Sequence, residues 1–218
     1  MIRVTLRDAA VGTGREAALP PVSTTFAAGT PTLLATEGGN RPTVLSLVAS
    51  GRMRLDAGSV AAVDSEGSAL SSAQLRRAVA LIDTPLVAEH SDDVSIATVV
   101  REELALARSN RRTERPAEYL DRHDFGSLAA DDRLRLLIDL ALRRPDVAAL
   151  VITSPERHGG EPALWWRVVR ETASRGIAVL VVTDAATVAH LERLPRPQPV
   201  GLDAVPLFDL ISSESRIA

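Results

Sequence analysis

A loop that joins an apolar segment to a helix-like segment contains the first residues with possible chemistry. The stretch Leu33–Gly51 reads LLATEGGNRPTVLSLVASG, which has the outline of a phosphate-binding loop. Gly39 and Thr43 fall where such a loop needs a glycine and a Mg²⁺-binding hydroxyl, but Arg41 and Pro42 replace its second glycine and its lysine. Because proline lacks an N–H and disfavours helical dihedrals in the residue before it, we expect an ordinary strand-to-helix turn here, unable to wrap a triphosphate.

A second group of polar residues follows two predicted strands. The run VAALVIT ends at Thr153 and is followed by Ser154, and Asp184 follows the run IAVLVVT. Open α/β sheets bind ligands at the carboxyl ends of their strands, so Ser154, His158 and Asp184 could form a hydrolase triad. No Gly-x-Ser-x-Gly elbow surrounds Ser154, which makes this hydrolase a minor alternative. The four histidines are too widely spaced in the chain for a metal motif.

Composition excludes several classes of function. The chain has 218 residues, a net charge of −3 and no cysteine, and all 25 of its basic residues are arginine. Without lysine or cysteine there can be no Schiff base, thiolate nucleophile or P-loop lysine. The net negative charge argues against nucleic acid as a partner. No apolar run reaches the roughly 20 residues that a membrane span needs, so we expect a cytoplasmic protein.

The distribution of apolar residues predicts an α/β fold with a parallel sheet. Three short runs at 79–82, 147–153 and 177–183 are apolar on both faces, as in strands covered on two sides, and 30–36 and 58–64 are further strand candidates. Helical patterns occupy 131–144 and 161–176. The first 30 residues suggest short strands and turns, and the polar segment 84–130 suggests a helical subdomain inserted in one domain spanning 1–218.

This order of elements resembles the nucleotide-binding domain of ABC transporters, which is a P-loop NTPase-like fold. The stretch SGRMRLDAGSVAAV (50–63) is similar to the family segment that follows the Walker A helix. LALRRPDVAALVITSPE (140–156) is similar to the segment that leads into Walker B, and GIAVLVVTDAA (176–186) resembles the strand that ends at the switch histidine. The resemblance covers nearly the whole chain and implies an ABC ATPase core with a β-rich N-terminal layer and a helical insertion.

The same resemblance implies that the catalytic motifs are lost. The Walker B aspartate and the catalytic glutamate correspond to Thr153 and Ser154, and the Q-loop glutamine and switch histidine correspond to Asp83 and Asp184. The signature sequence corresponds to residues 127–131, SLAAD, which keeps none of its glycines. By this alignment only Thr43 is preserved among the polar catalytic positions.

These correspondences favour a degenerate ABC-type subunit, a pseudo-ATPase that serves as scaffold or regulator of a membrane permease. Such a subunit needs no cofactor and lies in the cytoplasm or at the inner face of the cell membrane. It pairs with a membrane permease and can also pair with a second copy or another ATPase-like chain. The first alternative is a working subunit that binds Mg-ATP, with Arg41 supplying charge and Asp83 with Thr43 holding Mg²⁺. The second is the hydrolase based on Ser154 and Asp184.

Overall fold

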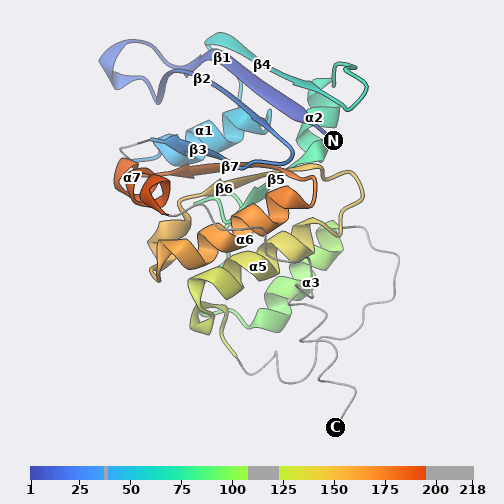
Figure 1. The fold of residues 1–218 in the computed structure, drawn as a ribbon, viewed down its shortest axis with the longest axis vertical. Coiled ribbons are helices and arrows are strands. Elements are labelled where there is room, and N and C mark those ends of the chain that lie inside the picture. The colour runs from blue at the N-terminus through green and yellow to red at the C-terminus, as the bar shows by residue number, and fades with distance from the viewer. Residues whose placement is uncertain (37–38, 108–122, 195–218) are drawn as a thin grey trace.

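The computed structural model describes residues 1–36, 39–107 and 123–194. A parallel sheet lies at the centre, an antiparallel sheet covers one side of it, and helices cover the other (Figure 1). The parallel sheet has the strand order β3 (Thr32–Ala35), β7 (Ala178–Thr183), β6 (Ala149–Thr153), β5 (Val79–Ile82).

The parallel strands are apolar on both faces because each face borders its own core. On β6, Leu150 and Ile152 face one cluster of buried side chains, whereas Ala149 and Val151 face the other. Side chains alternate across a strand, so a strand covered on both sides must be apolar throughout. The uninterrupted run ALVIT, in which every residue is buried, meets that requirement.

The first core lies between the parallel sheet and a layer of helices, with Trp165 as its largest fully buried side chain. The amphipathic sequence of α5 (Ala130–Ala141) turns Leu134, Leu137 and Ile138 inward. Pro162 lies in the first turn of α6 (Pro162–Ser174), and Gly176, at a φ of 87°, follows its end. The layer consists of α3 (Ile96–Leu106), α5 (Ala130–Ala141), α6 (Pro162–Ser174) and α7 (Ala185–Arg193).

The second core lies between the two sheets and contains helix α1 (Arg41–Ala49). Leu45, Val48 and Ala49 of this helix are fully buried there. Helix α2 (Ser72–Ala78) adds Leu75 and Ala78 to the same core and leads directly into β5. A capping box between Ser71 and Gln74 sets the start of α2.

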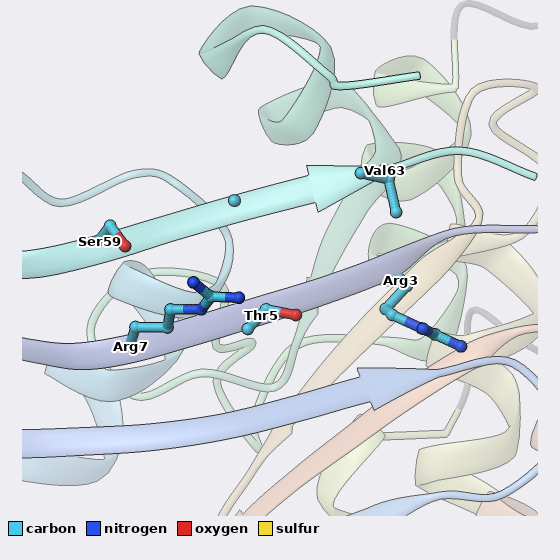
Figure 2. A pocket seen from close by; sticks show the side chains of 6 residues that line it. Arg3, Thr5, Arg7, Ser59 and Val63 are labelled. Atoms are coloured by element: carbon cyan, nitrogen blue, oxygen red, sulfur yellow. The ribbon is translucent and has the colours of Figure 1, made fainter. Parts of the chain in front are cut away.

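The antiparallel sheet has the order β2 (Leu19–Ala27), β1 (Arg3–Val11), β4 (Ala57–Val63). Arg3 and Arg7 project from the outer face of β1, beside small residues of β4 such as Ser59, and together they border a shallow hollow of about 280 Å³ (Figure 2). The register shifts between Arg7 and Ala10, where Gly58 has a φ of 76°. A Cβ at Gly58 would lie 2.2 Å from the carbonyl oxygen of Asp8, so this irregularity requires glycine.

The predicted fold class is confirmed, and the three apolar runs form strands β5, β6 and β7 of the parallel sheet. Two details differ from expectation. The N-terminal residues form two strands of nine residues rather than short pieces. The strand predicted at 58–64 belongs to the antiparallel sheet. The insertion predicted at 84–130 stays a prediction, because 108–122 lie outside the described residues; α3, within it, packs into the first core.

Candidate functional site at the carboxyl end of the parallel sheet

The carboxyl ends of the central strands bring polar residues together. Strand β5 is followed by Asp83 and Thr84, β6 ends at Thr153, and β7 ends at Thr183. All four residues are buried. Since parallel strands end at one edge of their sheet, residues far apart in the sequence meet there, where open α/β sheets place ligands.

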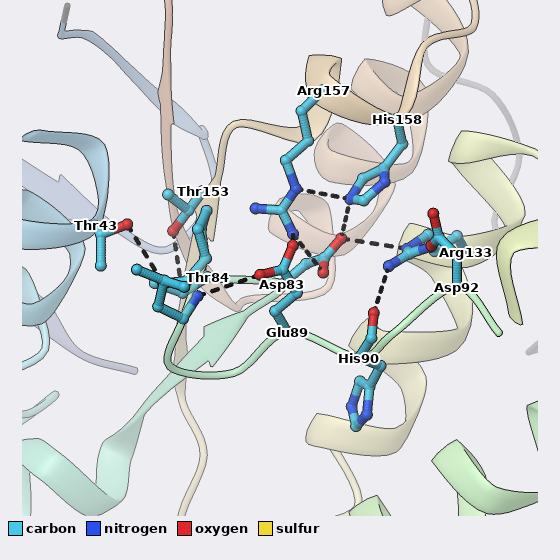
Figure 3. Close-up of polar contacts among 12 residues, drawn as sticks. Thr43, Asp83, Thr84, Glu89, His90, Asp92, Arg133, Thr153, Arg157 and His158 are labelled. Carbon is cyan, nitrogen blue, oxygen red and sulfur yellow. Dashed lines mark hydrogen bonds and ion pairs between the residues drawn. The ribbon is translucent and has the colours of Figure 1, made fainter. Parts of the chain in front are cut away.

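Asp83 is the centre of an ionic cluster at this edge (Figure 3). Its Oδ2 lies 2.6 Å from Nε2 of His158 and 3.4 Å from Nε of Arg133. Its Oδ1 accepts a hydrogen bond of 2.8 Å from Nη2 of Arg157. The same Nη2 lies 3.2 Å from a carboxylate oxygen of Glu89. Both oxygens of Asp83 are therefore occupied by cationic side chains of this chain.

Arg133 is the most enclosed cation of the cluster, with only 4% of its side chain exposed. It pairs with the carboxylate of Asp92 as well as with Asp83, and it donates a hydrogen bond of 3.2 Å to the carbonyl of His90. Its guanidinium carbon lies 4.1 Å from the ring centroid of Phe125. Through these contacts, α5 is joined to the segment that follows β5.

The cluster favours the ionised form of Asp83. Burial raises the pKa of this carboxyl, but the hydrogen bond from His158 and the charges of Arg157, His158 and Arg133 together lower the pKa below its usual value. Asp83 also has a left-handed backbone, at a φ of 51°. Such a conformation is strained for a non-glycine residue and persists where surrounding contacts enforce it.

His158 can make only one of its two short contacts as a conventional hydrogen bond. Its Nε2 lies 2.6 Å from Asp83 and 3.0 Å from Nε of Arg157, which is a donor. An ionised Asp83 requires a proton on Nε2, and a protonated Nε2 cannot accept from Arg157. The contact with Asp83 is the shorter of the two and involves a carboxylate, so Nε2 of His158 donates its proton to Asp83.

Buried hydroxyl groups form a second set of contacts beside the ionic cluster. The hydroxyl of Thr153 lies 2.8 Å from that of Ser46 in α1 and 2.9 Å from that of Thr84. Ser46 also donates to the carbonyl of Pro42, at 2.9 Å. These bonds connect the body of α1 to the ends of β6 and β5 without any charged group.

The structure places the predicted phosphate-loop residues at the beginning of α1. Arg41 is the first residue of the helix, Pro42 lies in its first turn, and Gly39 precedes it at a φ of 52°. The hydroxyl of Thr43 lies 3.5 Å from the carbonyl oxygen of Pro85, to which it donates a long hydrogen bond (Figure 3). Strand β3 and helix α1 therefore flank the predicted loop, and the hydroxyl of Thr43 points to the backbone after β5.

The residues of the hydrolase alternative make other contacts. Asp184 caps α7 by accepting from the backbone N–H of Thr187 at 2.6 Å. His158 is paired with Asp83, and Ser154 occupies a left-handed position at a φ of 47°. His158 therefore pairs with Asp83 instead of Ser154, and Asp184 pairs with the start of α7 instead of with His158.

The ionic cluster itself was missed at the sequence level, because its partners lie far from Asp83 along the chain. One signal was available: Asp83 directly follows an apolar run of strand type, as Thr153 does. Among the residues that the structure describes, there is no group of three His, Asp or Glu residues arranged to hold a metal ion. No helix in the same residues is long and apolar enough to cross a bilayer.

Known structures share this arrangement of layers. A nucleotide-free ATP-binding cassette from an ABC transporter superposes with a TM-score of 0.59 at 18% identity, covering 88% of this chain and 85% of that one. An ATP-binding subunit of an ABC transporter gives 0.56 at 16% identity, covering 98% and 99%. The chain has the fold of an ABC ATP-binding cassette.

Two further cassettes of similar fold belong to larger assemblies. The protein cbiO1 of Clostridium perfringens, part of the ABC transporter complex cbiONQ, superposes with a TM-score of 0.53 at 14% identity, over 83% of this chain and 78% of that one. The bacterial ABC transporter cassette MJ0796, in a dimeric structure, gives 0.52 at 15% identity over 86% and 90%. No sequence-family model and no curated protein sequence matches the chain.

Proposed function

We propose that this chain is an ABC-type cassette subunit that does not hydrolyse ATP. The proposal rests on one observation: the polar side chains at the carboxyl end of the parallel sheet are already paired with one another. Asp83 is its central carboxylate, and both of its oxygens contact Arg133, Arg157 and His158. The hydroxyl of Thr153 contacts two other hydroxyls. These polar groups stabilise one another and leave little for a triphosphate or its metal to bind.

The residues present do not fit Mg-ATP in the manner of a cassette. Pro42 contributes no N–H to the first turn of α1, and the chain has no lysine to reach a terminal phosphate. Thr43 donates to a backbone carbonyl, and at the end of β6 Thr153 and Ser154 offer hydroxyls where catalysis would need carboxylates. Asp83 cannot serve as a Mg²⁺ ligand without first losing its cationic partners.

The retained cassette fold supports a role in assembly. The cassettes of similar fold include one from a transporter complex and one that is dimeric. We infer that this chain likewise contacts a membrane permease, from the cytoplasmic side, and acts there as a scaffold or regulator. Pairing with a second cassette, of the same or another sequence, is compatible with this role.

Calorimetric titration with Mg-ATP tests the loss of nucleotide chemistry. We expect no Mg²⁺-dependent binding and no phosphate release from the natural chain. The double substitution Arg41→Gly with Pro42→Lys restores a glycine and a lysine to the loop, and it serves as the matched gain-of-function variant. Micromolar, Mg²⁺-dependent binding by the natural chain that disappears on Thr43→Val would contradict the proposal.

Co-purification tests the proposed association with a membrane permease. An affinity-tagged chain is isolated from native membranes with and without ATP, and the bound proteins are identified by mass spectrometry. We expect a multi-span membrane protein to be recovered in equal amounts under both conditions. Recovery of the chain from the soluble fraction alone would refute the permease association while leaving the nucleotide result untouched.

A further inference from the structure

The opposite end of the parallel sheet carries a pocket that takes no part in the site described above. It lies where the segments before β5 and β6 run side by side, joined by the hydrogen bond from Ala148 N–H to the carbonyl of Ala78, at 2.9 Å. The end of α3 closes it from the helical layer. The cavity measures about 370 Å³, and it is lined by Arg76, Arg77, Leu106, Ala107, Arg144, Pro145 and Asp146.

Three arginines from two different segments border this one cavity. Arg76 and Arg77 lie in the last turn of α2, and Arg144 lies in the turn between α5 and β6. Within the described part of the chain, none of the three forms an ion pair with a carboxylate, although Asp146 also lines the pocket. In a chain of net charge −3, this is a local concentration of uncompensated positive charge.

A fourth arginine, Arg52, adds positive charge close to Arg76 and Arg144. Although Arg52 as a whole is exposed, its guanidinium donates hydrogen bonds to the carbonyls of Ser50, Val79 and Arg76, at 3.3, 3.0 and 2.8 Å. These donors are thus used on the backbone, and within residues 1–36, 39–107 and 123–194 no carboxylate forms an ion pair with Arg52. Partial burial, and then the charges of Arg144 and Arg76, lower the pKa of Arg52.

We propose that this pocket binds a small phosphorylated molecule. Guanidinium groups keep their charge at all physiological pH values and match phosphate oxygens with paired N–H donors. Leu106, which is 61% exposed, and Pro145 add an apolar wall beside the cationic rim. The cavity volume falls within the range of small-molecule sites, so it admits a phosphate group together with a short organic body.

The hollow on the outer face of the antiparallel sheet lacks these properties. Its two arginines, Arg3 and Arg7, lie on one strand four residues apart, about 13 Å by the rise of a strand. They flank small side chains on an open sheet face (Figure 2). The pocket at the end of α2 is larger, about 370 Å³, and three arginines from two segments of the chain border it.

Calorimetric titration of the full chain with phenyl phosphate and pyrophosphate, at low salt, tests the proposal. We expect saturable binding that weakens as salt is added. Arg144→Gln and Arg77→Gln should each reduce the affinity about tenfold, the equivalent of one charge-assisted hydrogen bond. Arg193→Gln is the matched control, because Arg193 also lies in the last turn of a helix, α7, away from the pocket, and it should leave binding unchanged.

Two results would overturn the proposal: the absence of saturable binding of both probes, or equal binding by the natural chain and the two pocket variants. Arg144 also donates to the carbonyl of Ala141 at 3.3 Å, so Arg144→Gln loses a hydrogen bond within the fold. If that variant does not fold, the affinity of Arg77→Gln decides the test, because this substitution removes no hydrogen bond or ion pair among the described residues. Nucleotide binding lost on Arg77→Gln belongs to this pocket, and binding lost on Thr43→Val belongs to the loop before α1.

Discussion

Replacing Asp83 by asparagine removes one charge from the ionic cluster while preserving the shape of the side chain. Only 6% of the Asp83 side chain is exposed, so its partners receive little compensation from water. Arg133 would keep Asp92, whose side chain is 72% exposed, and Arg157 would keep Glu89. His158 would lose its only carboxylate partner within the described residues.

Asp83→Asn should lower the stability of the fold because it leaves buried cationic side chains without the carboxylate between them. Breaking a buried ion pair by removing one partner destabilises a protein by about 3–5 kcal/mol. For a chain of this size, each kcal/mol lowers the melting temperature by about 2–4 °C, so Asp83→Asn should lower it by roughly 6–20 °C. Asp146→Asn is the matched control, because this exposed carboxylate forms no ion pair in the described structure; its melting temperature should stay near that of the natural chain.

The melting temperatures of the natural chain and of Asp83→Asn should depend differently on pH in acid. The folded-state pKa of Asp83 is lowered, so its contribution to stability is fully present above the unfolded-state pKa, about 3.9. That contribution is lost as the pH falls from there through the lower folded-state pKa. The difference in melting temperature between the natural chain and Asp83→Asn should therefore be constant near neutrality and shrink below about pH 4.

Circular dichroism melts from pH 3 to pH 7 measure both effects. An Asp83→Asn protein that melts within about 2 °C of the natural chain at pH 7 would refute the reasoning, since that shift corresponds to less than about 1 kcal/mol. A difference that grows as the pH is lowered would refute the assigned direction of the pKa shift.

Three further substitutions address other contacts. Thr153→Val removes one hydrogen bond each from the hydroxyls of Ser46 and Thr84, and it should lower the free energy of unfolding in urea by about 1–3 kcal/mol. A loss below about 0.5 kcal/mol would contradict these buried hydrogen bonds. Gly58→Ala forces a Cβ against the carbonyl of Asp8 at a positive φ and should cost at least about 1 kcal/mol, with faster amide exchange in β4 than in β2; unchanged exchange would count against it. Ser71→Ala removes the capping box of α2 and should cost about 1 kcal/mol, whereas Ser72→Ala, one residue on, should be neutral; equal losses would argue against the cap.

The fold could be read from the sequence where one local rule decided the structure. The runs at 79–82, 147–153 and 177–183 are too short for helices and apolar throughout, so only a doubly covered strand accommodates them. Pro162 and Gly176 bracket α6 as helix-start and helix-end residues do. The strand at 57–63 was found by the same rule, but its sheet was not, because pairing with β1 depends on residues some fifty positions away.

The candidate site was harder to anticipate because its energetics depend on pairs separated by long stretches of chain. Asp83 meets Arg133 and Arg157 at sequence separations of 50 and 74. No local pattern distinguishes these two arginines from the other basic residues of the chain. His158 was considered beside Ser154, its neighbour in sequence, whereas the fold turns it toward Asp83 at the end of an adjacent strand.

Helix α1 is anchored at its middle rather than at its beginning. Leu45, Val48 and Ala49 are clamped between the two sheets, and Ser46 is tied to the end of β6. The buried apolar contacts that hold the helix therefore come from residues that follow Arg41 and Pro42. Substitutions at Arg41 and Pro42 are consequently expected to leave the architecture in place, and an engineer could rewrite the start of the helix without rebuilding the core around it.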